Sequence, residues 1–416
     1  MPYPAHEGDG KPSPCKLRMA IGWRYSSAGQ GTIMGSERVT VDTLLRVACE
    51  EEASDLHLKV GNNPYIRVDG DLRALDQYPH ITPEDMLDYA FSIMNSRQKA
   101  KFKENTEIDM PYGIAGLARF RVNIFQQRGN VGMIFRVIPT DIRTFSELSL
   151  PKVMERICQE TRGLVLVTGT TSSGKSTTLA AMVDYINSTR TEHIITIEDP
   201  IKFLHRDKKG LVSQREVEVD SASFAAALRS ALRQDPDVIL VGEMRDLETI
   251  QTALLAGETG HLVFSTLHTT DATEAVQRII AVFQPAEQKR VRLQLASTLK
   301  AVVCQRLVRK SDGIGRVPAV EVLLSTEYIR DCIVTPEKTR LIREALASGA
   351  SQYGMQTFDQ SLYELHSHGL ITLQEALANS SNPDEFKLRI SGVRGTLDAA
   401  RDAMERAIEV ERFAKR

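Results

Sequence analysis

The chain has 416 residues, enough for two or three domains that each bury a hydrophobic core. Its 52 Lys and Arg nearly balance its 54 Asp and Glu, and the net charge of -2 argues against nucleic-acid binding through a general basic surface, although a local basic patch stays open. There is no apolar run of about 18 residues and no secretory signal pattern, so we expect a cytoplasmic protein that meets a membrane only through partners.

The first part of the chain is predicted to be a disordered tail followed by a small α/β domain. Residues 1–36 are rich in Gly, Pro, Ser and Lys and have no hydrophobic period, which is typical of disorder. Within residues 37–140, we expect a helix over residues 41–49 and a second helix that Thr82 caps. The alternation of apolar and polar residues over 117–125 predicts a half-buried strand.

Residues 141–151 are predicted to be a linker, and residues 152–416 a second α/β domain. Strands and helices alternate in this second domain as they do around a parallel sheet. Beyond Thr270 the pattern predicts a mainly helical region, in which residues 372–375 form a capping box. The strands that we predict cover residues 164–168, 193–197, 211–217, 238–241 and 262–265.

A glycine-rich loop follows the first of these strands and precedes a helix. Its sequence, Gly-Thr-Thr-Ser-Ser-Gly-Lys-Ser over residues 169–176, has the spacing of a phosphate-binding loop, in which backbone N–H groups surround phosphate oxygens. Lys175 is expected to reach the β/γ-phosphates of a nucleotide, and the Ser176 hydroxyl to ligate Mg²⁺. The predicted nucleotide-binding residues of the loop are Gly169, Thr171, Ser172, Ser173, Gly174, Lys175, Ser176 and Thr177.

Acidic residues follow two of the predicted strands. Glu243 comes after residues 238–241, at the position where nucleotide hydrolases hold Mg²⁺ or polarise water, but Gly242 replaces the usual preceding Asp. Metal binding is therefore expected to fall to Ser176 together with Glu198 and Asp199, because parallel strands open at one edge. The alternative is that these acids cap the helices that follow them.

Two histidines flank the predicted strand over residues 262–265, and we expect both beside the edge that carries the loop. His268 lies in a segment dense in hydrogen-bonding groups, which suits a sensor of the γ-phosphate, and His261 is a candidate nucleotide contact. The alternative for each is a structural histidine.

Three arginines of the first domain, Arg119, Arg121 and Arg136, are predicted to lie on strands. Their planar guanidinium groups suit a terminal phosphate and could stabilise transition-state charge from a neighbouring domain or subunit. From the residues alone, solvated strand arginines are the favoured interpretation.

These motifs, in this order, resemble the PilT-type retraction ATPases of type IV pili within the secretion-system hexameric ATPases. In that family, residues 196–201 correspond to the Asp box, 237–243 to an atypical Walker B segment and 261–268 to the His box. Residues 338–344 resemble, mainly in their second half, a C-terminal motif that retraction requires beyond hydrolysis. The other matching segments are residues 53–57, 66–70, 117–123, 169–176, 241–246, 305–307 and 354–357.

The resemblance implies a PAS-like first domain and a RecA-like ATPase domain with a helical C-terminal region, assembled as a homohexamer. It implies ATP and Mg²⁺ as ligands, Glu243, Glu198, His268 and Arg121 as catalytic residues, and Arg119 and Arg136 as nucleotide contacts. The expected activity is ATP-driven pilus retraction at the cytoplasmic face of the inner membrane, through a platform protein. The rivals are a pilus-assembly or type II secretion ATPase, whose usual Cys-x-x-Cys zinc element is absent here, and an accessory ATPase that depends on a partner motor.

Overall fold

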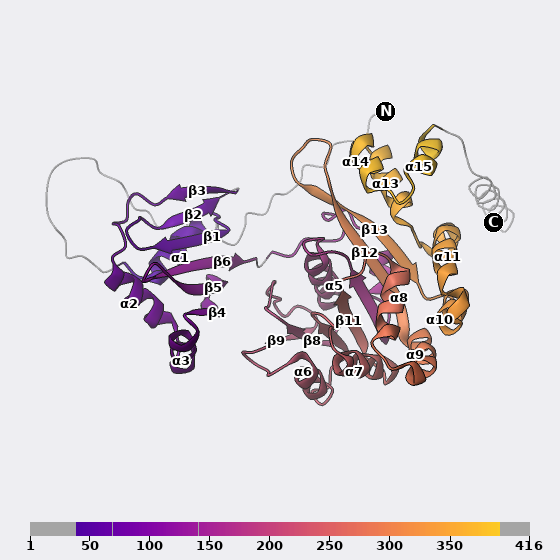
Figure 1. The fold of residues 1–416 in the computed structure, drawn as a ribbon, viewed down its shortest axis with the longest axis horizontal. Coiled ribbons are helices and arrows are strands. Elements are labelled where there is room, and N and C mark those ends of the chain that lie inside the picture. The colour runs from indigo at the N-terminus through magenta and orange to yellow at the C-terminus, as the bar shows by residue number, and fades with distance from the viewer. Residues whose placement is uncertain (1–38, 69, 140, 392–416) are drawn as a thin grey trace. The chain divides into compact units, whose positions relative to one another are not determined.

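A computed structural model of the chain describes residues 39–68, 70–139 and 141–391. The chain divides into two compact units, Met1–Pro139 and Thr140–Arg416 (Figure 1). The predicted tail over residues 1–36 lies outside the described residues. In the part of the chain that the structure describes, no helix is both long enough and apolar enough to cross a membrane.

The first unit is a six-stranded antiparallel sheet, with the strand order β3-β2-β1-β6-β5-β4, that packs three helices against one face. Phe120, Val122 and Ile124 of β5 are fully buried in that core. Arg119 and Arg121 alternate with them and therefore stand on the other face. The strands are β1 (Asp55–Lys59), β2 (Tyr65–Val68), β3 (Asp71–Ala74), β4 (Glu107–Ile114), β5 (Ala118–Gln127) and β6 (Asn130–Ile138), and the helices are α1 (Val41–Glu50), α2 (Pro83–Ile93) and α3 (Ser96–Asn105).

The predicted elements of this unit are confirmed. The helix expected over residues 41–49 is α1, and the alternating segment is β5. Thr82 begins α2 with a complete capping box, in which its hydroxyl accepts from the Asp85 N–H and the Asp85 carboxylate accepts from the Thr82 N–H.

The second unit is built on a seven-stranded sheet with the order β13-β12-β7-β11-β10-β8-β9. All neighbouring strands are parallel except β13, which pairs antiparallel with β12. Every residue of β7 is buried, as its continuous apolar sequence predicts for a central parallel strand. The strands are β7 (Gly163–Thr168), β8 (His193–Glu198), β9 (Leu211–Glu216), β10 (Val238–Val241), β11 (Leu262–Leu267), β12 (Leu299–Arg309) and β13 (Arg316–Leu324).

The five predicted strands of this unit are confirmed, with ends shifted by at most a few residues, and a helix connects each consecutive pair of them except β8 and β9 (Figure 1). Residues 141–151, expected as a linker, place Phe145 and Leu150 in the core of the second unit. The helices up to β12 are α4 (Val153–Ile157), α5 (Lys175–Thr189), α6 (Phe224–Ala231), α7 (Leu247–Glu258), α8 (Ala272–Ala281) and α9 (Pro285–Thr298).

The prediction of a mainly helical region beyond Thr270 is wrong for residues 299–324, which form the long hairpin of β12 and β13 (Figure 1). Both strands contain short apolar stretches interrupted by polar or charged residues, and such stretches do not separate a buried strand from a buried helix. Pro318 is tolerated because β13 is an edge strand. The helical elements that follow are α10 (Glu327–Val334), the 3-10 helix η2 (Pro336–Leu341), α11 (Ile342–Ser348), α12 (Ala350–Tyr353), α13 (Phe358–Ser367), α14 (Leu373–Asn379) and α15 (Pro383–Ile390).

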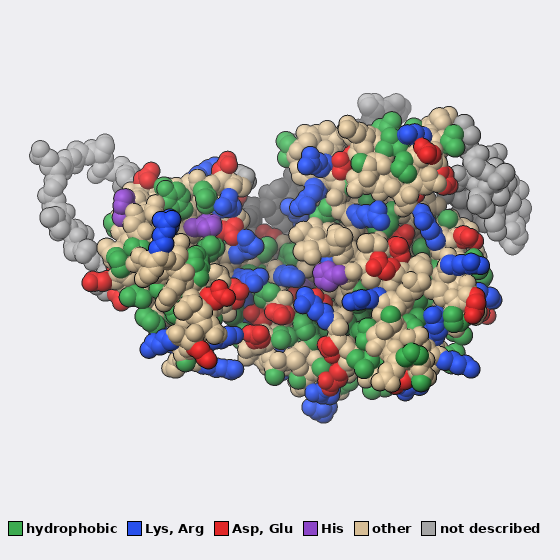
Figure 2. Space-filling model, viewed as in Figure 1, with side chains coloured by type: hydrophobic (Ala, Val, Ile, Leu, Met, Phe, Trp, Pro, Cys, Tyr) green, Lys and Arg blue, Asp and Glu red, His purple; other side chains and the backbone are tan. Residues whose placement is uncertain are grey.

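The predicted capping box at residues 372–375 is present in half. The Thr372 hydroxyl accepts from the Glu375 N–H, but the Glu375 carboxylate accepts instead from the Arg309 N–H on β12. On the visible face of each unit, acidic and basic side chains are interspersed (Figure 2). This mixture agrees with the near balance of charges in the sequence.

Candidate nucleotide site

The glycine-rich loop connects the end of β7 to the start of α5, and both of its glycines are required by the structure. Gly169 and Gly174 have φ angles of 144° and 92°, which side chains rarely adopt. A Cβ atom at Gly169 would lie 2.4 Å from the Gln305 carbonyl oxygen, and one at Gly174 would lie 2.7 Å from Gln305 Nε2. The loop therefore packs directly on β12, with no room for larger residues at these two positions.

The serines and threonines of the loop differ in exposure. Thr171 and Ser172 are exposed, and Ser172 adopts a left-handed φ of 63°. Ser173 is buried, yet its hydroxyl has no hydrogen-bond partner among the described residues. A buried hydroxyl without a partner costs free energy, so this atom is suited to a phosphate oxygen.

Lys175 is folded back into the loop at the N-terminus of α5. Its ammonium donates to the carbonyl oxygens of Gly169 and Thr170, both at 2.8 Å. Burial lowers the pKa of Lys175, the nearby Lys202 lowers it further, and Glu243 acts in the opposite direction. A negatively charged ligand at this position would favour the charged ammonium in the same way that Glu243 does.

Glu243 lies at the end of β10, where its carboxylate contacts two cationic or polar partners. Arg245 Nε is 2.8 Å from Glu243 Oε1, and His268 Nε2 is 3.5 Å from Glu243 Oε2. The proposed alternative, that Glu243 caps the next helix, is wrong, because Asp246 caps α7 by accepting from the Thr249 N–H at 2.8 Å.

Gly242 stands where the usual Asp is missing. A Cβ atom at Gly242 would lie 3.2 Å from the Ile197 carbonyl oxygen and 3.4 Å from the Glu198 Cα. The Gly242 N–H also donates to that carbonyl at 2.8 Å. The end of β10 is therefore packed closely against β8, which disfavours a larger residue at this position.

Glu198 ends β8, one strand away from Glu243 in the sheet. Burial raises its pKa, while hydrogen bonds from Thr196 at 2.8 Å and Gln214 at 3.2 Å favour the carboxylate. Asp199 follows and is exposed. Neither residue caps a helix, because the next regular element is β9, so that alternative is wrong here as well.

The donor set at this edge of the sheet fits Mg²⁺. The ion prefers oxygen ligands, and it is usually held by one or two carboxylates together with phosphates and water. The Ser176 hydroxyl at the start of α5 and the carboxylates of Glu198 and Asp199 supply such oxygens. Among the described residues, no group of three His, Cys, Asp or Glu side chains forms a dedicated metal site, so the protein's part would be limited to these few ligands.

The two histidines of β11 lie at opposite ends of that strand. Leu267 pairs with Thr168, next to the loop, whereas Leu262 pairs with Gly163 at the far end of β7. His261 precedes Leu262 and contacts the Ala256 carbonyl oxygen at the end of α7, with Nδ1 at 3.0 Å. At ~3.3 Å per residue, the strand separates His261 from the loop edge by roughly 20 Å. The expectation that both histidines lie at the loop edge is therefore wrong for His261.

The three predicted arginines belong to the first unit, and the structure places them on β5 and β6. Arg121 is paired in register with Arg136 on the neighbouring strand. Arg136 Nε donates to the buried Asp55 at 2.9 Å, and Arg121 forms a longer ion pair with Asp109, at 3.5 Å. Both guanidinium groups remain largely exposed, and Arg119 is partly buried beside them.

Two glutamines that the sequence did not single out support the site. Gln305 of β12 is buried, and its Oε1 accepts from the Thr178 hydroxyl of α5 at 2.8 Å. Gln214 of β9 donates to Glu198 and to the Phe203 carbonyl oxygen. Gln305 lies in residues 305–307, one of the segments that resemble the family. That resemblance was the one feature of the sequence that pointed to this residue.

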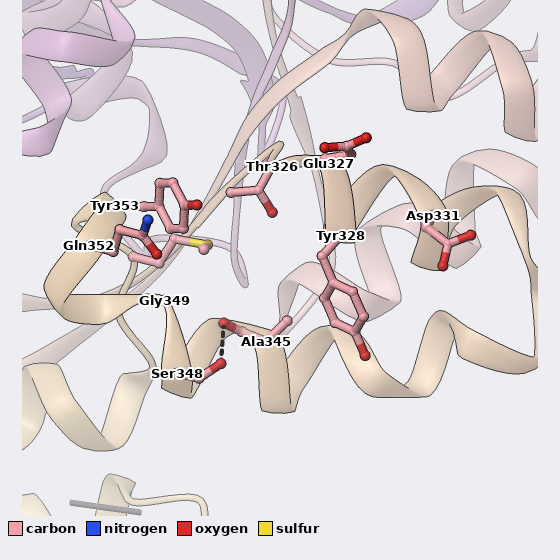
Figure 3. A pocket seen from close by; sticks show the side chains of 10 residues that line it. Thr326, Glu327, Tyr328, Asp331, Ala345, Ser348, Gly349, Gln352 and Tyr353 are labelled. Carbon is pink, nitrogen blue, oxygen red and sulfur yellow. Dashed lines mark hydrogen bonds between the residues drawn. The ribbon is translucent and has the colours of Figure 1, made fainter. Parts of the chain in front are cut away.

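A separate hollow of ≈ 680 Å³ lies among α10, α11 and α12, and no residue of the loop lines it (Figure 3). Tyr328 and Asp331 of α10 line one side, and Gln352 and Tyr353 line the other. The hollow adjoins residues 338–344, the segment that resembles the C-terminal motif of retraction ATPases.

The model of the family described as "Type II/IV secretion system protein" matches residues 34–349 of the chain. The chain belongs to this family. It is 47% identical over 346 residues to the Pseudomonas aeruginosa protein named "Type IV pilus retractation ATPase PilT", a match that covers 83% of this chain and 99% of that protein.

A second relative and a solved structure are also similar to this chain. The P. aeruginosa protein named "Type IV pilus ATPase PilU" is 42% identical over 84% of this chain and 91% of its own length. A crystal structure described as the pilus retraction motor PilT with bound ADP has a TM-score of 0.77 and 46% identity, over 84% of this chain and 99% of that one. The α/β fold of this secretion-protein family is thus shared by this chain.

Proposed function

We propose that the chain is the subunit of an ATP-hydrolysing motor that drives retraction of type IV pili. The observation that carries the proposal is the phosphate-binding loop held between β7 and α5, with Glu243 and Glu198 at the adjacent strand ends. The 47% identity over nearly the whole of a protein named as a pilus retraction ATPase supports it. The antiparallel first unit fits a PAS-like domain, and the parallel second sheet fits a RecA-like ATPase domain.

In this proposal the loop binds the phosphates of ATP through its backbone N–H groups, the Ser173 hydroxyl and Lys175. Glu243 orients or deprotonates the attacking water, and its contact with His268 couples that carboxylate to the end of β11. When bound, Mg²⁺ neutralises charge on the phosphates, and Ser176, Glu198 and Asp199 would hold it.

Three arginines of the first unit are also part of the proposed site. Arg119, Arg121 and Arg136 are proposed to contact nucleotide in a homohexamer, where their charge would stabilise the transferred phosphoryl group. Arg136 is already oriented by Asp55, which leaves most of its guanidinium exposed. The hexamer is proposed to act at the cytoplasmic face of the inner membrane through a platform protein of the pilus machine.

Deleting the gene alone and counting surface pili tests the proposal. Excess pili without twitching motility are expected from loss of retraction. Absence of pili would instead indicate an assembly motor, and near-normal behaviour would indicate an accessory ATPase that depends on a partner. The 42% identity to PilU, close to the 47% to PilT, makes that third outcome a necessary arm of the experiment.

The chemistry is tested separately with the purified protein. Lys175→Ala is expected to abolish ATP turnover, because it removes the ammonium that the loop positions for the phosphates. Turnover at the wild-type rate in that variant would contradict the assignment of the site.

A further inference from the structure

Lys202 places a second ammonium group at the edge of the phosphate-binding loop. Its Nζ is 3.3 Å from the hydroxyl of Ser176, the residue that is expected to ligate Mg²⁺. Among the described residues, this hydrogen bond is the one that the Lys202 side chain makes, and the side chain has no carboxylate ion-pair partner. An exposed lysine without an ion-pair partner is free to meet an anionic ligand.

Hydrogen bonds hold the backbone on both sides of Lys202, and they fix the position of this residue at the site. The Lys202 N–H lies 3.4 Å from Glu198 Oε2. On the other side, Gln214 donates to the Phe203 carbonyl oxygen at 2.9 Å and accepts from the His205 N–H at 2.8 Å. The segment after β8 is therefore held on the sheet, with Lys202 beside the start of α5.

Lys202 and Lys175 place two ammonium groups at the loop: Lys175 Nζ donates to the Gly169 carbonyl oxygen at 2.8 Å, and Lys202 Nζ lies 3.3 Å from the Ser176 hydroxyl. Two like charges placed in this way repel each other. Two ammonium groups beside one helix N-terminus, where backbone N–H groups also point, form a strongly anion-attracting arrangement. A nucleoside diphosphate or triphosphate supplies the several negative charges that would relieve this repulsion.

We propose that Lys202 is a second phosphate-binding ammonium of this site, and that it competes with Mg²⁺ at the Ser176 hydroxyl. The inference rests on the proposed nucleotide site at the loop. Without Mg²⁺, Lys202 neutralises phosphate charge; when Mg²⁺ binds to the same hydroxyl, the flexible lysine side chain moves away from Ser176. Two cations at one position repel each other, so Lys202 weakens the binding of Mg²⁺ to the nucleotide complex.

The test compares the Kd of ADP in EDTA with the Kd in saturating Mg²⁺, by calorimetric titration of the purified full-length protein. Lys202→Gln is expected to weaken binding in EDTA by about 10-fold and to leave binding in Mg²⁺ nearly unchanged, so the ratio of the two Kd values rises by about 10-fold. The Mg²⁺ concentration that half-saturates the ADP complex is expected to fall in the same variant. Lys202→Met should repeat both results, and Lys202→Arg should keep the wild-type ratio.

The matched control is Lys208→Gln. Lys208 lies in the same segment, but its ammonium is bound by Asp184 at 2.7 Å and by the Ser188 hydroxyl at 3.1 Å. Its removal is expected to leave the ratio of the Kd values unchanged. A ratio for Lys202→Gln within about twofold of wild type would overturn the inference.

The experiment separates this inference from the proposed function. If wild-type protein binds no ADP, or if Lys175→Ala binds it as well as wild type does, the proposed site itself is wrong. If Lys175→Ala loses binding while Lys202→Gln keeps the wild-type ratio, the site stands and only the role of Lys202 is wrong.

Discussion

Gln305 of β12 supports the phosphate-binding loop. Replacing it should lower the free energy of unfolding for two separate reasons, a lost hydrogen bond and a cavity. The side chain is 3% exposed, and its Oε1 accepts from Thr178, which is 1% exposed, at 2.8 Å. Gln305→Met keeps most of the volume and removes the acceptor, so the buried hydroxyl is left unpaired at a cost of about 1–3 kcal/mol. Gln305→Ala also leaves a cavity beneath Gly174, which adds roughly 1–2 kcal/mol.

A double-mutant cycle with Thr178→Val isolates the hydrogen bond. In the Thr178→Val background no donor is left unpaired, so Gln305→Met should cost much less, and the coupling free energy should be about 1–2 kcal/mol. The free energy of unfolding is measured by urea titration with circular dichroism. As a control, Gln294→Met removes an exposed hydrogen bond from a partly buried side chain to Glu258, and it should change stability by less than about 0.5 kcal/mol. Strictly additive effects of the two buried substitutions would refute the reasoning.

Three other substitutions probe the same unit. Ser172→Gly should stabilise the protein by about 0.5–1 kcal/mol, because glycine adopts the observed φ of 63° without strain; a lower Tm with ADP binding intact would contradict this. Burial raises the pKa of Glu321 to about 7 from 4.5, so the folded protein keeps a proton that the unfolded chain releases, and stability falls as the pH rises between these values. Glu321→Gln removes that loss, so the free energy of unfolding of the variant, measured with urea, should rise relative to wild type by up to roughly 3 kcal/mol as the pH increases from about 4.5 to 7. The same dependence of unfolding free energy on pH in both proteins would contradict this prediction. Glu243→Gln should keep ADP binding but lower ATP turnover by about 100-fold or more, and a rate within a few-fold of wild type would rule out its role as the base.

Most of the secondary structure was predictable, because the signals were local. Thr82 and Pro83 mark the start of α2 through capping chemistry that needs no information from the rest of the chain. The continuous apolar sequence of β7 similarly indicates a strand buried on both faces. The hairpin of β12 and β13 was missed because its apolar stretches are short and interrupted by polar or charged residues, and such stretches do not separate a buried strand from a buried helix.

The phosphate-binding loop was predictable in the same local way, but the placement of its neighbours required topology. Parallel strands bring Glu198 and Glu243 to one edge, as expected. His261 was misplaced although it precedes the same strand that His268 follows, because residues that flank one strand lie at its opposite ends. The error concerned the direction of the chain and not the assignment of the strand.

The residues that the sequence did not reveal share one property: each depends on a partner that is far away in the chain. Gln305 and Thr178 are 127 positions apart, and the buried Glu321 accepts from the Ala272 N–H, 49 positions before it. A single sequence contains no spacing rule for such pairs, since the sheet order decides which strands become neighbours. The hairpin, which lies in the region expected to be mainly helical, carries both Gln305 and Glu321, so the strands that were not predicted hold the side chains that link the loop to β12 and α8 to β13. The loop motif was predictable alone, but the support that β12 gives it through Gln305 follows only from the hairpin.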